Sequence, residues 1–486
     1  MNRAKIVRTV AVFMALAGIA GATLAQDSTP VKPGGRPVKQ TPPPKPPPAA
    51  PEQAPAPAEE FPKKDRPAPE VGPYITQSNP RDLVLTVHIS LNSESPTDRT
   101  SYRDPFTGQT VDMPNVRPFE FQTLAMVFPM LPSTASSDPY PKEYKGKLTI
   151  NDVLASDEAK IMTGYPGGVK LARFDSNDKS QATRCRQVEL LLEVPARCYR
   201  LKFDESAALK VPWPQGPWPK EAASILTPQL YVETGVDGEG HVRPYEDKLV
   251  SETLQRWLGD EGISDPKRVN PAALAKILTG KVWGSIQIDR EGLSLKRTGE
   301  LSGVVIQPPE WTLQNGKGAP HDAVVLLATM LRKVGLPTRV MAGWDVGKGD
   351  GKFLKKGDKQ NKLRTWVEFC LYDEEANTIN WVPIDIVKLR QSTSRPPAVT
   401  QNWRFFGAND EFDSVVPFAM HFHPPTDVVS YGWPGFWGWF VTPKPPEAAE
   451  QSIRFTATTM SVRGGQPPRD PKKKDDEARP PARRGY

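Results

Sequence analysis

Residues 316–344 read GKGAPHDAVVLLATMLRKVGLPTRVMAGW, and this stretch decides the fold. Its centre carries start and stop signals of a helix. Pro320 is favoured in the first turn, and the Asp322 carboxylate is favoured near the positive amino end of the helix dipole. Gly335 ends the helix. Apolar residues recur along one helical face, at Ala323, Leu327, Met330, Leu331 and Val334. We therefore predict a buried helix, followed by a strand over residues 339–344.

Two more strands follow this helix. LRTWVEFCLYD alternates as a strand from Leu363, and NWVPIDI follows after a turn at residues 374–377. A long buried helix against antiparallel strands predicts an α+β core.

This core resembles the transglutaminase-like superfamily, whose papain-like fold has a Cys at the amino end of such a helix, a His on the next long strand and an Asp on the one after. The resemblance runs from about Trp311 to Ile386, and TLQNGKG, LLATMLRKVGLPTRVMAG, TWVEF and WVPID match in order and spacing. It continues more loosely through WRFFGANDEFD near Phe405. It implies a domain in which a helix packs on an antiparallel sheet.

The sequence departs from the family at the nucleophile. In the family's glycine-x-glycine-x-cysteine-x-acid pattern, Gly316 and Gly318 supply the glycines and Asp322 the acid. This alignment places Pro320 where the Cys should be. Proline offers no nucleophile.

The second departure falls on the catalytic histidine. The family's His-Ala-Trp becomes Arg364, Thr365 and Trp366, and only Asp385 is kept from the triad. Arginine keeps its proton at any physiological pH, so it can hold a carboxylate but cannot shuttle a proton. We expect no catalytic residues here, and an ion pair between Arg364 and Asp385.

No neighbouring side chain replaces the missing groups. His321 is adjacent to Pro320 but points about 100° away from it on a helix. Cys370 shares a strand face with Arg364 but lies ~20 Å along it, and is predicted to be a buried, inert thiol. The cleft that the family implies offers a candidate ligand site at His321, Asp322, Trp366 and Trp381.

The two ends of the chain differ in composition from its middle. Residues 1–25 have the basic, apolar and small-residue order of a secretory signal peptide, which predicts export to a periplasm or beyond the cell. Residues 26–73 form a Pro-rich linker, and residues 463–486 a charged tail. Both are predicted to be disordered.

Between these ends we predict two domains. Residues 74–235 contain short β-prone runs separated by Pro, Gly, Ser and Asp clusters, which favours a β-rich, sandwich-like domain. Residues 236–462 form the transglutaminase-like domain. QVELLLEV and CYRLKF are read as two strands with a break at Pro195.

The cysteine count allows one disulfide at most, and the sequence does not decide whether it forms. The chain has three cysteines, and Cys185 with Cys198 is the candidate bridge. A tight hairpin at Pro195 would separate these two residues by ~25 Å, so a bridge requires that the two strands are not hairpin partners.

The composition also bears on ligands. The net charge is +7, but basic and acidic residues are interspersed, so we expect no nucleic-acid partner. His421 and His423 have metal-ligand spacing without a third ligand nearby, so we expect no metal and no cofactor. The aromatic stretch from Phe422 to Pro443 is read as a packed loop, with a platform for a glycan or peptide as the alternative.

These observations predict an exported, noncatalytic transglutaminase-like protein. It would bind a peptide, a protein or a cell-envelope polymer, or act as a scaffold. One alternative is an active cysteine hydrolase or acyltransferase whose nucleophile the alignment has misplaced. Another is a purely structural surface protein, favoured if the cleft is filled by its own side chains.

Overall fold

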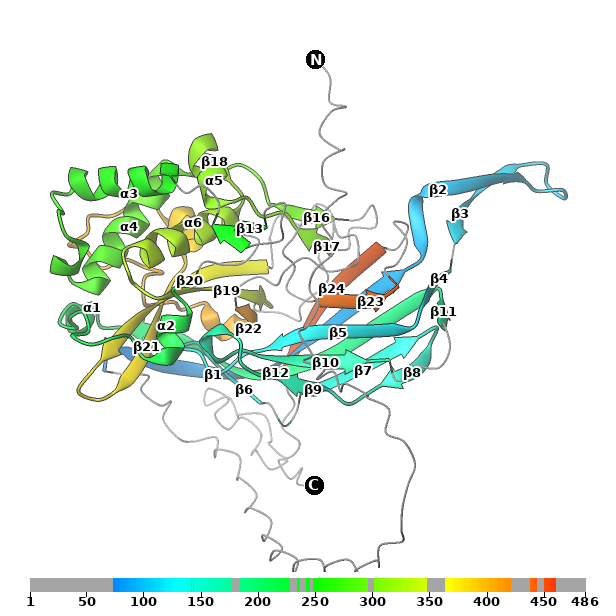
Figure 1. Ribbon diagram of the computed structural model, residues 1–486, viewed down its shortest axis with the longest axis horizontal. Helices are drawn as coiled ribbons and strands as arrows, with labels where there is room; N and C mark the ends of the chain where they lie inside the picture. The colour runs from blue at the N-terminus through cyan, green and yellow to red at the C-terminus, as the bar shows by residue number, and fades with distance from the viewer. Residues whose placement is uncertain are drawn as a thin grey trace, which may run out of the picture. The chain divides into compact units, whose positions relative to one another are not determined.

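The computed structural model describes residues 73–459 apart from 117, 141, 143, 177–182, 228–233, 237–241, 245–247, 296–300, 348–362, 421–437 and 444–449. The described residues combine helices with mainly antiparallel strands, as predicted (Figure 1). They fall within one compact unit. Among their helices, none has the length and apolar character needed to span a membrane.

The largest sheet is built around two long strands that pair along most of their length. Its order is β16 (Leu293–Leu295), β17 (Leu301–Val304), β24 (Glu450–Thr459), β1 (Ile75–Asn92), β12 (Gln187–Phe203), β7 (Lys145–Ile150) and β8 (Val153–Ser156), and β6 (Ser137–Pro139) also pairs with β12. Alternate residues of β1 from Leu83 to Leu91 are buried. This alternation is the period of a strand with one face on a core.

A second sheet packs against the first. Its order is β23 (Gly438–Thr442), β5 (Thr123–Met130), β10 (Lys170–Asp175) and β9 (Lys160–Met162). The ring of Phe174 in β10 lies over Gly146 of β7, where any Cβ would overlap the ring. Glycine at this position therefore lets the aromatic side chain fill the space between the sheets.

The third sheet carries the helix that the sequence predicts. Its order is β21 (Thr378–Ile384), β20 (Leu363–Asp373), β19 (Thr338–Asp345) and β22 (Val415–Met420), and α6 (Pro320–Lys333) packs on β19 and β20. The sequence predicts one buried face for α6, but every residue from His321 to Arg332 is buried. Its remaining faces contact α3 (Lys248–Asp260), α4 (Pro271–Ser285), α5 (Pro309–Asn315) and α7 (Ile386–Ser392).

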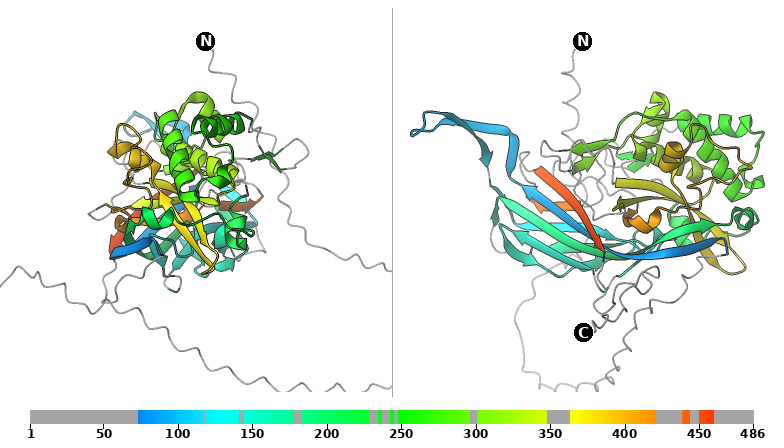
Figure 2. Two further views of the ribbon diagram at one scale, coloured as in Figure 1. Left: turned by 90° about the vertical axis from the view of Figure 1, so that its left-hand side faces the viewer. Right: turned by 180° about the vertical axis from the view of Figure 1, so that it is seen from behind.

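The remaining elements are short or paired in twos. The short helices are α1 (Glu205–Ala208) and α2 (Lys220–Ser224). The two-stranded pairs are β4 (Phe119–Phe121) with β11 (Thr183–Cys185), β13 (Thr234–Val236) with β14 (Val242–Pro244), β15 (Gln287–Ile288) with β18 (Lys317–Gly318), and β2 (Glu94–Arg103) with β3 (Thr110–Val116). The β2–β3 hairpin projects beyond the sheets in both Figure 1 and Figure 2.

Strands from late in the chain complete the sheets of the early segment. β24 pairs with β1, and β23 pairs with β5. Trp344 of β19 stacks on Phe455 of β24 with ring centroids 4.9 Å apart, which joins the third sheet to the first. The division of the chain at residue 235 and the sandwich layout of residues 74–235 stay predictions.

The predicted break at Pro195 is wrong, because β12 runs through it without a register shift. The Pro195 carbonyl accepts a hydrogen bond from Tyr140, so the ring nitrogen faces the same side. On that side the partner strand changes from β7, which ends its pairing at Glu193, to β6, which begins at Ala196. The missing N–H of proline therefore falls where no ladder bond is required.

The continuous strand also separates the two candidate disulfide partners. Cys185 lies in β11, and Cys198 is eleven residues beyond the first residue of β12. An extended chain of that length spans ~35 Å, far more than a disulfide can bridge. Both residues are buried free thiols in the structure.

Candidate functional site

The amino end of α6 is closed by its own hydrogen bonds. Pro320 is the first residue of the helix, as predicted. The Asp322 carboxylate is fully buried and accepts hydrogen bonds from the backbone N–H of Ala319 (2.8 Å) and of Gln307 (2.7 Å). It also accepts one from the Arg290 guanidinium at 2.7 Å. Asp322 therefore anchors Arg290 and Gln307 to the start of the helix and has no free face for a ligand.

His321 is held in the same way. Its Nε2 lies 2.6 Å from the Val305 carbonyl oxygen, and its ring contacts the tight turn at Gly292. Burial lowers the pKa of the His321 imidazole, although the Asp322 carboxylate 3.8 Å away opposes that shift. The side chain is therefore a neutral, buried donor to Val305.

Arg364 and Asp385 form the ion pair that the sequence predicts. Arg364 projects from β20, and Asp385 is the N-cap of α7, directly after β21. An Arg364 Nη donates to the Asp385 carboxylate at 2.6 Å, and both side chains are almost fully buried. The other carboxylate oxygen of Asp385 caps α7 by accepting from the Lys388 N–H at 3.0 Å. Asp385 is thus occupied by two structural partners.

Two further carboxylates face the same guanidinium. Arg364 Nη1 lies 3.3 Å from Asp345 Oδ2 and 3.1 Å from Glu411 Oε2. The Lys388 ammonium lies 2.8 Å from the same Glu411 oxygen. We call these five residues, Asp345, Arg364, Asp385, Lys388 and Glu411, the Arg364 cluster.

The charges of this cluster shift its pKa values. Partial burial raises the pKa of the Glu411 carboxyl, but the hydrogen bond from Lys388 and the charge of Arg364 outweigh it, and the pKa lies below its usual range. Burial lowers the pKa of the Arg364 guanidinium, but the three facing carboxylates raise it more strongly, so it ends above its ordinary value. A guanidinium that stays protonated this firmly cannot act as a general base.

The two tryptophans of the predicted ligand cleft are core residues. Trp366 is fully buried, donates from its indole to Glu368 at 3.1 Å, and packs on the Phe412 ring with centroids 4.9 Å apart. Trp381 lies under the Arg339 guanidinium, 4.3 Å from the ring centroid. Arg339 in turn pairs with Glu368 across β19 and β20 at 2.6 Å. This buried network ties the strands together.

The structure therefore brings Arg364 and Asp385 together and separates the four candidate cleft residues. His321 and Asp322 contact the 290–307 segment, whereas Trp366 and Trp381 lie within the third sheet. All four are buried, so they do not line an open cleft in this conformation.

Sequence reasoning missed the other members of the Arg364 cluster. Asp345 ends β19, Lys388 lies in α7, and Glu411 follows the loop after α7, so only the fold makes them neighbours. A weak signal existed for the Arg339–Glu368 pair. Arg339 is the one charged residue of the predicted strand 339–344, and Glu368 lies among apolar neighbours in the next predicted strand.

Cys370 is buried in β20, as predicted. Burial raises the pKa of its thiol well above the ordinary value, which opposes thiolate formation. It packs with Ala222, Ile225 and Trp381.

Within the described part of the chain, no group of three His, Cys, Asp or Glu residues could hold a metal ion. The predictions for His421 and His423 lie outside the described residues, as does most of the aromatic stretch. Of its described residues, Trp439 is buried and donates to Gln451 at 3.1 Å, whereas Phe440 is exposed.

Comparisons with known proteins agree with this core. Residues 289–386 match the family model described as the transglutaminase-like superfamily. This match covers α5, α6, β19, β20 and β21. No curated protein matches the chain.

Among solved structures, a candidate cysteine protease from Cytophaga hutchinsonii is 11% identical, with a TM-score of 0.37, over 78% of this chain and 99% of that one. The periplasmic domain of TgpA from Pseudomonas aeruginosa is 12% identical, with a TM-score of 0.24, over 65% and 91%. Red sea bream transglutaminase is 14% identical, with a TM-score of 0.22, over 54% and 48%.

Proposed function

We propose that this chain, whose residues 289–386 form a transglutaminase-like core, is an exported noncatalytic member of that superfamily that binds a peptide, a protein or a cell-envelope polymer, or acts as a scaffold. One observation carries the proposal. The Arg364 guanidinium donates to the Asp385 carboxylate at 2.6 Å, in the position where an imidazole would have to exchange protons. Pro320 supplies no nucleophile at the start of α6.

The alternative of a purely structural surface protein without a ligand has its own support. Trp366, Trp381, His321 and Asp322 are all buried in contacts with their own chain. None of these four side chains is therefore open to a ligand. If the protein instead binds a ligand, we expect the ligand to contact Glu411 and Lys388, which form the partly exposed rim of the Arg364 cluster.

Catalysis is tested with the purified full chain. We expect no incorporation of a fluorescent primary amine into a glutamine-containing protein and no hydrolysis of unfolded casein above a heat-denatured sample. Asp385→Asn is the matched control. Turnover by the wild type that disappears in an Asp385→Asn protein shown by circular dichroism to be folded would contradict the proposal, because a working triad needs that carboxylate.

Restoring the missing groups gives a complementary test. In Pro320→Cys with Arg364→His, a helix amino end and an imidazole would again stabilise a thiolate. We expect iodoacetamide to label the introduced thiol of this double variant far faster at pH 7 than any thiol of the wild type. Fast labelling of the native wild type would point instead to an active cysteine that the alignment misplaced.

Binding and export have separate probes. Isolated cell-wall sacculi should co-sediment with the full chain, and less so with Lys388→Glu, if the rim of the Arg364 cluster holds the polymer. Co-sedimentation that is equal for both proteins excludes that rim, and its absence for both favours the scaffold form.

Export predicts a mature chain that begins at Gln26, which intact-mass analysis of the protein from its native cell would measure.

A further inference from the structure

The β2–β3 hairpin is an arm without a partner strand among the described residues. Its two strands pair with each other and form a separate two-stranded sheet. An isolated hairpin of this kind is marginally stable in water. Its projection beyond the sheets is visible in Figures 1 and 2. Among the described residues, the outer edges of both strands are therefore open to a partner.

The tip of the arm is held in a fixed shape. The Asp104 carboxylate accepts from the Phe106 N–H at 2.8 Å and from the Thr107 hydroxyl at 2.8 Å. Gly108 adopts a positive φ of 68° and donates its N–H to the Asp104 carbonyl. These bonds preorganise the turn, which lowers the entropy cost of binding.

This rigid turn displays apolar side chains to solvent. Phe106 is 97% exposed, and Tyr102 and Val111, which face each other across the two strands, are also exposed. Exposed aromatic anchors on a fixed loop are typical of protein interfaces.

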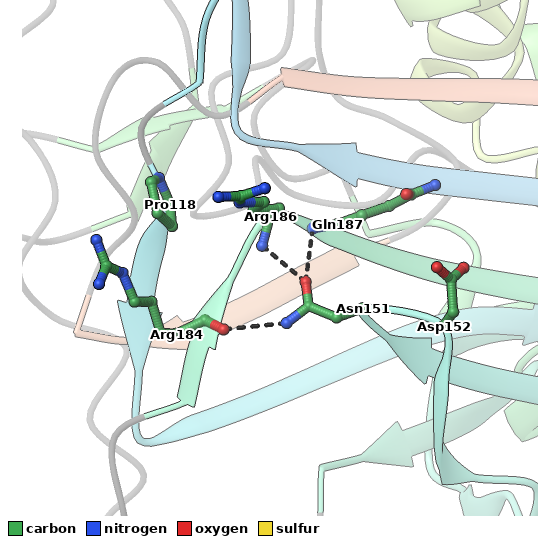
Figure 3. Close-up of a pocket in the computed structure, with 6 residues that line it drawn as sticks. All are labelled: Pro118, Asn151, Asp152, Arg184, Arg186 and Gln187. Atoms are coloured by element: carbon green, nitrogen blue, oxygen red, sulfur yellow. Dashed lines mark hydrogen bonds between the residues drawn. The ribbon is translucent and has the colours of Figure 1, made fainter.

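A complementary surface lies at the base of the same arm. A pocket of about 440 Å³ is lined by Pro118, Asn151, Asp152, Arg184, Arg186 and Gln187. Figure 3 shows the two guanidinium groups on either side of Pro118. Both arginines are exposed, and neither side chain has a hydrogen bond or ion pair to another described residue. Val153, which follows Asp152, is 69% exposed and adds an apolar spot beside them.

The backbone of this pocket is also fixed. The Asn151 side chain accepts from the Arg186 N–H at 2.9 Å and donates to the Arg184 carbonyl at 3.0 Å, as Figure 3 shows. Asn151 and Asp152 occupy the β7–β8 turn with positive φ. The two arginines are therefore presented from a rigid edge.

The charges of arm and pocket are opposite. The described side chains of the arm, at residues 101–112, include two acidic groups, Asp104 and Asp112, and one basic group, Arg103. The pocket carries Arg184 and Arg186 against Asp152. An acidic arm with an apolar tip matches a basic pocket with an apolar rim.

We propose that the arm of one copy docks into the pocket of a second copy, and that the two copies form a reciprocal dimer. Phe106 enters the pocket beside Pro118 and Val153, and Asp112 lies near Arg184 and Arg186. Because arm and pocket occupy the same end of each molecule, a two-fold axis makes the contact twice. An anionic membrane is disfavoured as the occupant, since such surfaces attract basic segments and this arm is acidic.

Sedimentation equilibrium of the full chain tests the proposal. The wild type should sediment as a dimer at micromolar concentration, and Phe106→Ser and Arg184→Glu with Arg186→Glu should each weaken dimerisation at least about 30-fold. Leu209→Ser, which changes an exposed apolar residue elsewhere on the surface, should leave the dimer unchanged.

Mixing the two defective proteins distinguishes this interface from any other. Phe106→Ser keeps an intact pocket and the arginine variant keeps an intact arm, so a mixed pair recovers one of the two contacts. We expect the mixture to form heterodimers more tightly than either variant forms homodimers. A wild type that stays monomeric up to about 100 µM, or a Phe106→Ser dimer of unchanged affinity, overturns the proposal. So does a monomeric wild type that binds phosphatidylserine vesicles through Phe106.

Discussion

Arg364 is surrounded by more negative charge than it can neutralise. Asp345, Asp385 and Glu411 all lie within 3.3 Å of its guanidinium, and Lys388 supplies the second positive charge. Buried charges of this kind contribute little net stability when all partners are present, yet they are costly to break. Arg364 and Asp385 are therefore part of the structural core.

Removing Arg364 tests this role. Arg364→Ala leaves Asp385 buried without its partner, so we expect the free energy of unfolding to fall by about 3–5 kcal/mol. Arg404→Ala is the control, because its ion pair with Asp410 is exposed and should contribute no more than about 1 kcal/mol. Chemical denaturation measures both, and equal losses would show that the Arg364 pair is not structural.

His321 should make stability depend on pH. Its folded-state pKa is lowered by burial from an ordinary value of 6.5, so the unfolded chain binds more protons as pH falls below about 6.5. The stability is fully present above that pH and declines below it, by at most about 1.4 kcal/mol per pH unit, until the folded-state pKa is reached. Denaturation between pH 7.5 and 5 should show this slope in the wild type and not in His321→Gln. A slope of the same size in both proteins would assign it to other groups.

At the scale of elements, α6 is fixed by the segment that covers its first turn. Gly292 adopts φ 68°, and a Cβ there would overlap both Ala319 and His321. Its carbonyl accepts the Val305 N–H at 2.7 Å, which holds the loop against the helix end. These contacts, and not only the helix sequence, fix the first turn of α6.

Gly292→Ala should therefore lower the free energy of unfolding. The positive φ and the steric overlap together should cost about 2–4 kcal/mol. Gly262→Ala has the same φ of 68° and nothing near its Cβ, so it should cost only about 1 kcal/mol. Thermal unfolding of the two variants compares them directly. If Gly262→Ala proves as destabilising as Gly292→Ala, the contact with α6 contributes nothing.

At the scale of the whole molecule, β24 joins the third sheet to the first. Phe455 in this strand stacks on Trp344 of β19, and its ring centroid also lies 4.9 Å from that of Phe418 in β22. Because β24 pairs with β1, these rings connect the transglutaminase-like core to the long strands of the first sheet. We expect the two parts to unfold together.

Phe455→Ala should lower the stability of both parts. The cavity should cost about 3–5 kcal/mol. Hydrogen exchange in rising denaturant would follow peptides from β1 and β20 separately, and we expect both to lose protection at the same, lower concentration. Loss confined to one of them would favour the two independent domains that the sequence predicts.

Local patterns in the chain were enough to predict α6 and the strands around it. Pro320 and Gly335 mark the helix ends, and alternation marks β20 and β21, because these signals depend on backbone geometry within a few residues. The Arg364–Asp385 pair was also predictable, since a family pattern supplied its spacing. The break at Pro195 was mispredicted because the sequence does not show which neighbouring strand lies beside a proline.

Only the tertiary structure decided the rest. Asp345 and Glu411 are far apart in the chain and meet at Arg364 because β19, β20 and the loop after α7 converge. The pairing of β24 with β1 and the burial of the four residues predicted to line a cleft have the same origin. Charge neutralisation and close packing act between surfaces that the fold brings together, and no local pattern encodes which surfaces those are.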